Sequence, residues 1–139
     1  MANWRRFLEL STSHLVSPCR TIAGAWNSED ERVPLRRSWC SWTTFTRLEA
    51  DAGYWTGELP LITELADTGI RDGGSWGQPF PYAELAHVMI PRRFEEEYAD
   101  NGAFHIWGHE QDIDGLSMLL TADGIEHRHS KYVLEIRLF

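Results

Sequence analysis

The clearest pattern of hydrophobic and polar positions covers residues 104–139. Side chains alternate along 104–109, which predicts a strand with Phe104 and Ile106 on its buried face. A second alternation predicts a C-terminal strand, whose buried face would carry Tyr132, Leu134, Ile136 and Leu138. The segment between them, DIDGLSMLLTADG, is predicted to be a helix, so we expect a strand–helix–strand unit at this end of the chain.

The N-terminal part predicts three further elements. Residues 4–11, WRRFLELS, alternate between apolar and polar and therefore predict a strand. Ser17 followed by Pro18 is typical of a helix start, and that helix would end near Asn27. Its apolar face would consist of Cys19, Ile22, Ala23 and Trp26. Residues 38–48 are rich in Trp, Thr and Phe and predict another strand.

The same patterns predict a short helix, a loop and a strand in the middle of the chain. Residues 60–66 predict the helix, which Gly69 would end. Residues 71–81 hold three glycines and two prolines and predict a long loop. Trp76 lies in that loop, and we expect it either to pack on the core or to form an exposed anchor. Residues 84–90 predict a strand.

Residues 92–100 are predicted to form an acidic helix. Phe94 and Tyr98 are four positions apart and would share one helical face. Asn101-Gly102, which follows, is a typical turn sequence. The chain thus alternates strands and helices, but its strands are polar on one face, unlike the strands of buried parallel sheets. We therefore expect a single α+β domain over 1–139, with a mixed or mostly antiparallel sheet and helices on one side.

Composition limits the classes of partner. The chain has 139 residues and a formal charge of −8, which argues against direct binding of nucleic acid and favours a basic protein surface as partner. It contains no apolar run long enough to span a membrane. We expect no signal peptide, no cofactor and a cytoplasmic location. Cys19 and Cys40 match no metal or redox spacing, and we expect them to be reduced and buried.

Four histidines are the candidates for metal binding or catalysis. His105, His109, His127 and His129 would face away from the core if their two strands shared one sheet, with Glu110 or Asp112 as a nearby carboxylate. No H-E-x-x-H motif is present, so we favour a solvated polar face over a metal site. The hydroxyls beside His14, in Ser11, Thr12 and Ser13, are similarly interpreted as strand-end and turn chemistry.

The candidate binding residues are acidic. Glu95, Glu96, Glu97 and Asp100 cluster in the predicted helix, and Arg92 and Arg93 would neutralise part of that charge at helical spacing. Together with Trp76 of the loop, these acidic residues are the predicted contacts for a basic partner. No catalytic residue is predicted.

The opening LELSTSHL followed by a proline-started helix resembles small accessory proteins encoded by phages and plasmids. An acidic, tryptophan-rich chain without motifs also resembles in kind the phage-encoded anti-CRISPR proteins and the immunity proteins of bacterial toxins. The resemblance implies a non-enzymatic inhibitor that occupies a basic surface of a defence nucleoprotein complex. Alternatives are a toxin immunity protein, a histidine-dependent metallohydrolase, and an assembly protein that pairs its C-terminal edge strand across a dimer.

Overall fold

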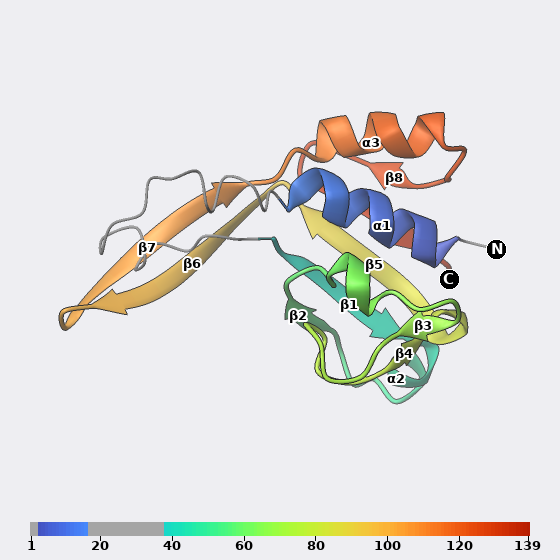
Figure 1. The fold of residues 1–139 in the computed structure, drawn as a ribbon, viewed down its shortest axis with the longest axis horizontal. Coiled ribbons are helices and arrows are strands. Elements are labelled where there is room, and N and C mark those ends of the chain that lie inside the picture. The colour runs from blue at the N-terminus through green and yellow to red at the C-terminus, as the bar shows by residue number, and fades with distance from the viewer. Residues whose placement is uncertain (1–2, 17–37) are drawn as a thin grey trace.

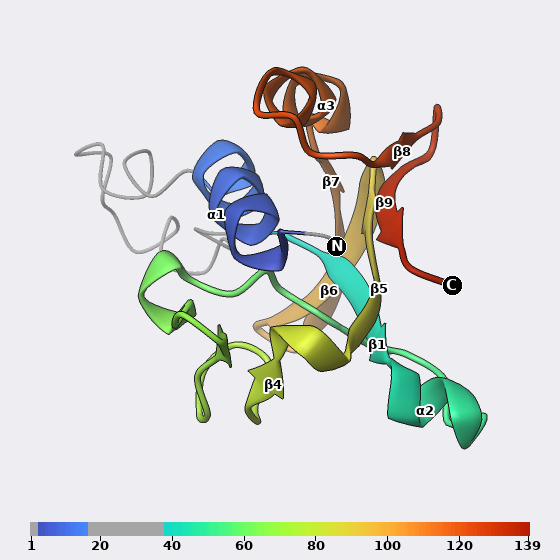
Figure 2. The ribbon, with the colours of Figure 1, turned by 90° about the vertical axis from the view of Figure 1, so that its right-hand side faces the viewer.

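A five-stranded sheet in the order β2-β1-β5-β9-β8 organises the fold, and all its neighbouring strands are antiparallel (Figure 1). The computed structural model describes residues 3–16 and 38–139. The strands are β1 (Cys40–Thr44), β2 (Trp55–Gly57), β5 (Leu85–Pro91), β8 (Arg128–His129) and β9 (Val133–Arg137). Two helices, α1 (Trp4–Leu15) and α3 (Ile113–Ala122), lie on the same side of this sheet (Figure 2). The expected α+β class is confirmed.

The core lies between this sheet and the two helices. Val88 and Ile90 of β5 and Leu134 of β9 are fully buried, as are Leu8 of α1 and Leu116 of α3. Each such side chain contributes about 1.5–3 kcal/mol to folding by leaving water. The buried positions of α3 recur at helical spacing, which confirms the predicted helix and explains how it packs.

Residues 58–84 close one end of the core with short elements. These are a 3-10 turn η3 (Ile62–Glu64), the β3–β4 pair (Gly69–Ile70 with Phe80–Pro81) and a second 3-10 turn η4 (Tyr82–Glu84). The predicted loop contains Trp76, whose ring stacks on Trp42 at 4.0 Å between centroids and 5° between planes. Trp76 is only 5% exposed, so it takes the core-packing alternative, and its indole surface is not available to a partner.

The predicted strand over residues 4–11 is wrong, because this segment forms helix α1. Trp4, Phe7, Leu8, Ser11 and Thr12 are buried, which is one helical face. Asn3 caps the helix by accepting a hydrogen bond from the Arg6 amide at 3.1 Å. The alternation in the sequence fits either period over eight residues, and packing selects the helical one.

Two other predicted elements are shorter than expected. The strand predicted over 38–48 ends at Thr44, whose side chain caps helix α2 (Phe45–Glu49) by accepting from the Arg47 amide. The helix predicted over 60–66 is reduced to the single turn η3. The strand predicted over 84–90 is confirmed as β5. The helix predicted from Ser17 to Asn27, with Cys19, lies outside the described residues.

The acidic helix predicted over 92–100 is also wrong: Arg93–Asp100 is strand β6, paired antiparallel with β7 (Ala103–Glu110) in a separate two-stranded sheet. The Asn101-Gly102 turn is confirmed, with φ of 51° and 79°. Positive φ at both positions is typical of tight two-residue hairpin turns, whose backbone twist matches that of the two strands. This turn, together with cross-strand pairing, outweighs the weak strand propensity of the glutamates.

The predicted inward faces of the last two strands need correction. Phe104 and Ile106 are 81% and 66% exposed, so the predicted core role of this strand is wrong. In β9, Leu134 and Ile136 are buried as expected, but Tyr132 is 73% exposed and Leu138 is 40% exposed. The elements of the strand–helix–strand unit are confirmed, whereas its two strands belong to different sheets.

Within residues 3–16 and 38–139, none of the helices has the length and apolarity needed to cross a membrane. Cys40 is a free, fully buried thiol, as expected, and burial raises its pKa above the ordinary range.

Candidate functional site

The β6–β7 hairpin projects from the rest of the fold (Figure 1). Its cross-strand pairs include Glu97 opposite Ile106 and Ala99 opposite Phe104. Side chains of directly opposed residues share a face, so Glu95 and Glu97 lie beside Ile106 and Phe104. All four are exposed. We call these four residues the hairpin face.

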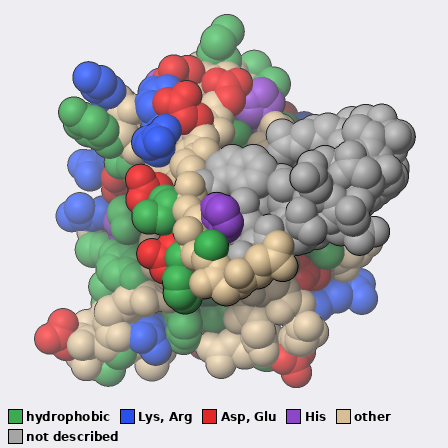
Figure 3. Space-filling view, turned by 90° about the vertical axis from the view of Figure 1, so that its left-hand side faces the viewer, with side chains coloured by type: hydrophobic (Ala, Val, Ile, Leu, Met, Phe, Trp, Pro, Cys, Tyr) green, Lys and Arg blue, Asp and Glu red, His purple; other side chains and the backbone are tan. Residues whose placement is uncertain are grey.

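The hairpin face combines negative charge with unusually exposed apolar groups. In the view toward the hairpin end, acidic and hydrophobic side chains lie next to one another near the middle of the molecule (Figure 3). Arg93 begins the same face, and its guanidinium lies over Gly108, where a Cβ would approach it to 2.5 Å. Gly108 is the cross-strand partner of Glu95, so the positive charge lies level with Glu95, and Glu97, Ile106 and Phe104 lie farther out.

The root of the hairpin is held by aromatic stacking. The Phe94 ring, 7% exposed, lies between two other rings, 5.8 Å from Trp39 and 4.8 Å from His109, with interplanar angles of 18° and 16°. Gln111 directly follows β7 and is also buried. These contacts join the start of β1 to both strands of the hairpin.

An ionic cluster around the first turn of α3 adds to this anchor. Asp114 accepts two hydrogen bonds from Arg92, at 2.7 and 2.9 Å, and lies 2.7 Å from His129 Nε2. Hydrogen bonding to Arg92, and then to His129, lowers the pKa of Asp114 to about 2. Asp112 caps α3 through the Gly115 amide and lies 2.8 Å from His14 Nε2. The Gly115 bond, followed by the His14 contact, lowers the Asp112 pKa as well.

The structure brings together two of the four acidic residues that were predicted to bind a partner. Glu95 and Glu97 come together on the hairpin face. Glu96 and Asp100 are in β6, opposite Trp107 and Ala103, and their side chains lie outside the described part. Trp76 is buried in the core and is not part of this surface. The helical pairing expected for Arg92 is replaced by its contact with Asp114.

The four candidate histidines are not brought together. His105 and His109 are in β7, whereas His127 and His129 are at the far edge of the five-stranded sheet. Among the residues that the structure describes, no group of three or more His, Cys, Asp or Glu side chains is arranged to hold a metal ion. Glu110 lies opposite Arg93 in the hairpin, and Asp112 serves as a helix cap.

His127 has a structural pairing instead. Its Nδ1 lies 2.8 Å from the Ile125 carbonyl, which can only accept, so Nδ1 carries the proton. In the neutral imidazole, Nε2 then accepts from the Ser117 hydroxyl at 2.7 Å. The residues near His14 are also structural: Ser11 donates to the Phe7 carbonyl within α1, and Thr12 donates to the Pro60 carbonyl, both at 2.7 Å. The expected turn at Ser11–His14 is therefore wrong.

A buried histidine that sequence patterns did not single out lies on the other face of the sheet. His87 is 5% exposed, and its Nε2 lies 2.9 Å from Glu135 while its Nδ1 lies 2.7 Å from the Tyr54 hydroxyl. Burial lowers the His87 pKa, against the effect of Glu135, and burial raises the Tyr54 pKa. A neutral imidazole and a protonated phenol make this a satisfied hydrogen-bond chain. The alternating pattern along β5 places His87 opposite the predicted buried face, so the sequence did not indicate that His87 is buried.

No protein-family model, curated protein or solved structure matches this chain.

Proposed function

We propose that the chain is a non-enzymatic binding protein that docks its hairpin face onto a basic, partly apolar surface of a partner protein. The observation that carries the proposal is the exposure of Phe104 and Ile106 beside Glu95 and Glu97 on a projecting hairpin. Binding hot spots are typically apolar anchors that become buried in the complex. Glutamates next to such anchors select a positively charged partner and accelerate association.

The partner chemistry also supports an inhibitory role. A surface rich in arginine and lysine is the kind of surface that holds phosphates, and carboxylates compete for the same donors. The net charge of −8 strengthens attraction to such a surface. We therefore propose that the protein blocks a nucleic-acid-binding complex, with a bacterial defence complex as the specific candidate. A toxin immunity protein would use the same chemistry against a basic nuclease.

Matched hairpin variants test this proposal. The full chain, the F104S/I106T double variant and the E95Q/E97Q double variant are immobilised separately and exposed to bacterial lysate. M118S is the control, because Met118 is 74% exposed but lies on α3. We expect one protein to bind to the wild type and M118S, with about 10-fold or greater loss for F104S/I106T. E95Q/E97Q should bind more weakly and with less dependence on salt.

The captured protein then decides between the inhibitory roles. Binding of a labelled DNA or RNA to the purified partner is measured by fluorescence polarisation with increasing amounts of this chain. Displacement by the wild type, and not by F104S/I106T, supports inhibition. Equal capture by all four immobilised chains, with circular dichroism confirming that each is folded, would rule out the hairpin face as the binding site.

A further inference from the structure

The edge of the five-stranded sheet is incomplete next to β9. Strand β5 pairs with β9 from Val133 to Arg137. On the other side, β8 pairs only at Arg128 with Glu135 and at His129 with Leu134. Beyond Glu135, β8 supplies no residue opposite β9. This leaves a gap where continued antiparallel pairing would have placed residues 125–127.

The main chain of Arg137 points into this gap. The Leu138 amide donates to the Ala86 carbonyl at 2.9 Å, so position 138 directs its main-chain groups toward the β5 side. Successive residues of a strand direct these groups to opposite sides. The Arg137 N–H and C=O are therefore directed away from β5, where β8 offers no partner. Among residues 3–16 and 38–139 this strand edge is open, and such an edge is a template for pairing with another chain.

The gap is held open by contacts of the segment that follows α3. Gly124 turns the chain with a φ of 75°, and the Ile125 amide then bonds the Leu120 carbonyl at 2.9 Å. The His127 bond to Ser117 adds to this attachment, and the His127 bond to the Ile125 carbonyl holds the turn of the segment itself. Residues 124–127 are thus fastened to α3 and cannot pair with β9 unless these bonds break.

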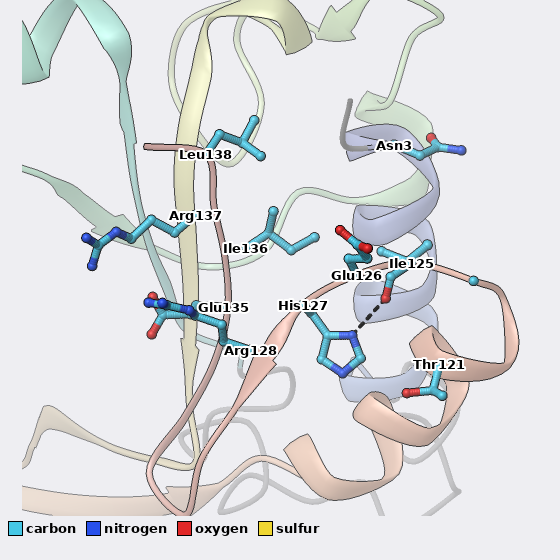
Figure 4. A pocket seen from close by; sticks show the side chains of 11 residues that line it. Asn3, Thr121, Ile125, Glu126, His127, Arg128, Glu135, Ile136, Arg137 and Leu138 are labelled. Carbon is cyan, nitrogen blue, oxygen red and sulfur yellow. Dashed lines mark hydrogen bonds between the residues drawn. The ribbon is translucent and has the colours of Figure 1, made fainter.

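A hollow of about 1020 Å³ occupies the gap, which is at the upper end of the range for ligand sites. Ile136 projects from β9 toward Ile125 of the facing segment (Figure 4). Glu135 and Arg137 contribute to the lining from β9, but their side chains point to the opposite face of the sheet, where Glu135 contacts His87 (Figure 4). The lining therefore presents no group of like-charged side chains that would favour a free anion or cation. Its open main-chain groups suit a polypeptide.

We propose that this hollow receives an extended peptide segment of a partner protein, which adds a strand to β9. Its main chain would pair with Arg137, and an apolar side chain would lie against Leu138, which lines the hollow and is 40% exposed. Peptides that complete a sheet edge gain affinity from main-chain bonds and specificity from side-chain pockets. The hollow has walls on two sides, β9 and residues 124–127, which suits a single strand. This site is independent of the hairpin face and does not rest on the proposed function.

Hydrogen exchange and peptide selection test the proposal together. In the free protein, the Arg137 amide should exchange much faster than the Leu138 amide, which is bonded to β5. Seven-residue peptides are then selected on the full chain from a displayed random library. A selected peptide should slow exchange at Arg137 at least 10-fold and shift the NMR signals of Leu138. Methylation of the peptide amide that pairs with Arg137 should abolish this protection.

Variants on α3 provide a second readout. T121W places a large ring in the hollow, because Thr121 lines it, and should weaken binding of the selected peptide at least 10-fold. M118W is the control, since Met118 is exposed on the same helix outside the lining. Failure to select any peptide, or selection of peptides that leave Arg137 exchange unchanged, would overturn the proposal. Concentration-dependent protection of Arg137 without peptide would assign the edge to a second copy of the chain and also overturn it.

Discussion

Gln111 and Trp39 are joined by a pair of hydrogen bonds that closes the root of the hairpin. The Trp39 amide donates to Gln111 Oε1, and Gln111 Nε2 donates to the Trp39 carbonyl, each at 3.0 Å. Nε2 also donates to the Pro91 carbonyl at 2.9 Å. One buried side chain therefore satisfies main-chain groups at the start of β1 and at the end of β5. It lies where both strands of the hairpin meet the five-stranded sheet.

Replacing Gln111 by alanine is expected to destabilise the fold and loosen the hairpin. Q111A leaves one N–H and two carbonyl groups without their partner in a buried region, and each such loss costs about 1–3 kcal/mol where water cannot enter. We expect a loss of about 2–4 kcal/mol in the free energy of unfolding, measured by urea denaturation. Amide exchange in β6 and β7 should also accelerate.

Q78A is the matched control, because Gln78 is exposed in the 71–81 loop. Q78A should change the free energy of unfolding, measured by urea denaturation, by less than about 0.5 kcal/mol, as surface substitutions usually do. A Q111A protein as stable as Q78A would show that the Gln111 bonds do not hold the hairpin root.

The elements that the sequence predicted well were those with a single consistent signal. Helix α3 has apolar positions at helical spacing, and Asn101-Gly102 has strong turn chemistry, so both were identified. Residues 4–11 fit two periods at once, and the helix was chosen by packing of Phe7 and Leu8 into the core. Residues 92–100 have helix-forming glutamates, but the pairing with β7 decided their conformation.

The candidate site was only partly predictable for a related reason. The acidic residues Glu95 and Glu97 were identified by charge alone. Their association with Phe104 and Ile106 depends on the register of the hairpin, which periodicity does not fix. His87 shows the same limitation: its burial results from Tyr54, Glu135 and the C-terminal residue Phe139, which come from other parts of the chain.

Acid should weaken the ionic cluster at α3. The pKa of Asp114 is about 2 in the fold against an ordinary value of 3.8, so its contribution to stability is present above about pH 4 and is lost as pH falls toward 2. Between pH 4 and pH 2, unfolding is accompanied by the binding of at most about one proton at Asp114. D114N should therefore show a shallower fall of the urea midpoint between pH 4 and pH 2 than the wild type.

D72N serves as the control for that experiment, since Asp72 is exposed in the 71–81 loop. Its pH dependence should match that of the wild type. Identical slopes for D114N and D72N would mean that the contact between Asp114 and Arg92 does not persist in solution.

The His87 imidazole should titrate below its ordinary value of 6.5, because burial disfavours its charged form. The neutral form then stabilises the fold above pH 6.5, and this contribution is lost as pH falls below 6.5 toward the folded pKa. Side-chain ¹⁵N NMR would follow the titration. E135Q should lower the His87 pKa further, because the Glu135 bond and charge both raise it. E84Q, at an exposed site, should leave it unchanged, and a rise in E135Q would contradict the assignment.

A methyl group added at Gly74 should destabilise the fold, because Glu64 occupies the space that it would need. A Cβ at position 74 would lie 1.9 Å from Glu64 Oε1, and that carboxylate is 8% exposed and accepts hydrogen bonds from the Leu61 and Ser75 amides. G74A would therefore displace a carboxylate that satisfies two main-chain donors, at a cost of about 1–3 kcal/mol.

G108A provides the comparison, because the nearest atoms to a Cβ there belong to the end of the Arg93 side chain. Arg93 is exposed, so this side chain can move away. We expect G108A to change the free energy of unfolding by less than about 1 kcal/mol, since surface substitutions usually have small effects. Thermal and urea unfolding of both variants would measure the difference. Equal stability of G74A and G108A would show that Glu64 can leave its buried position without loss, and that the loop holding Trp76 does not depend on it.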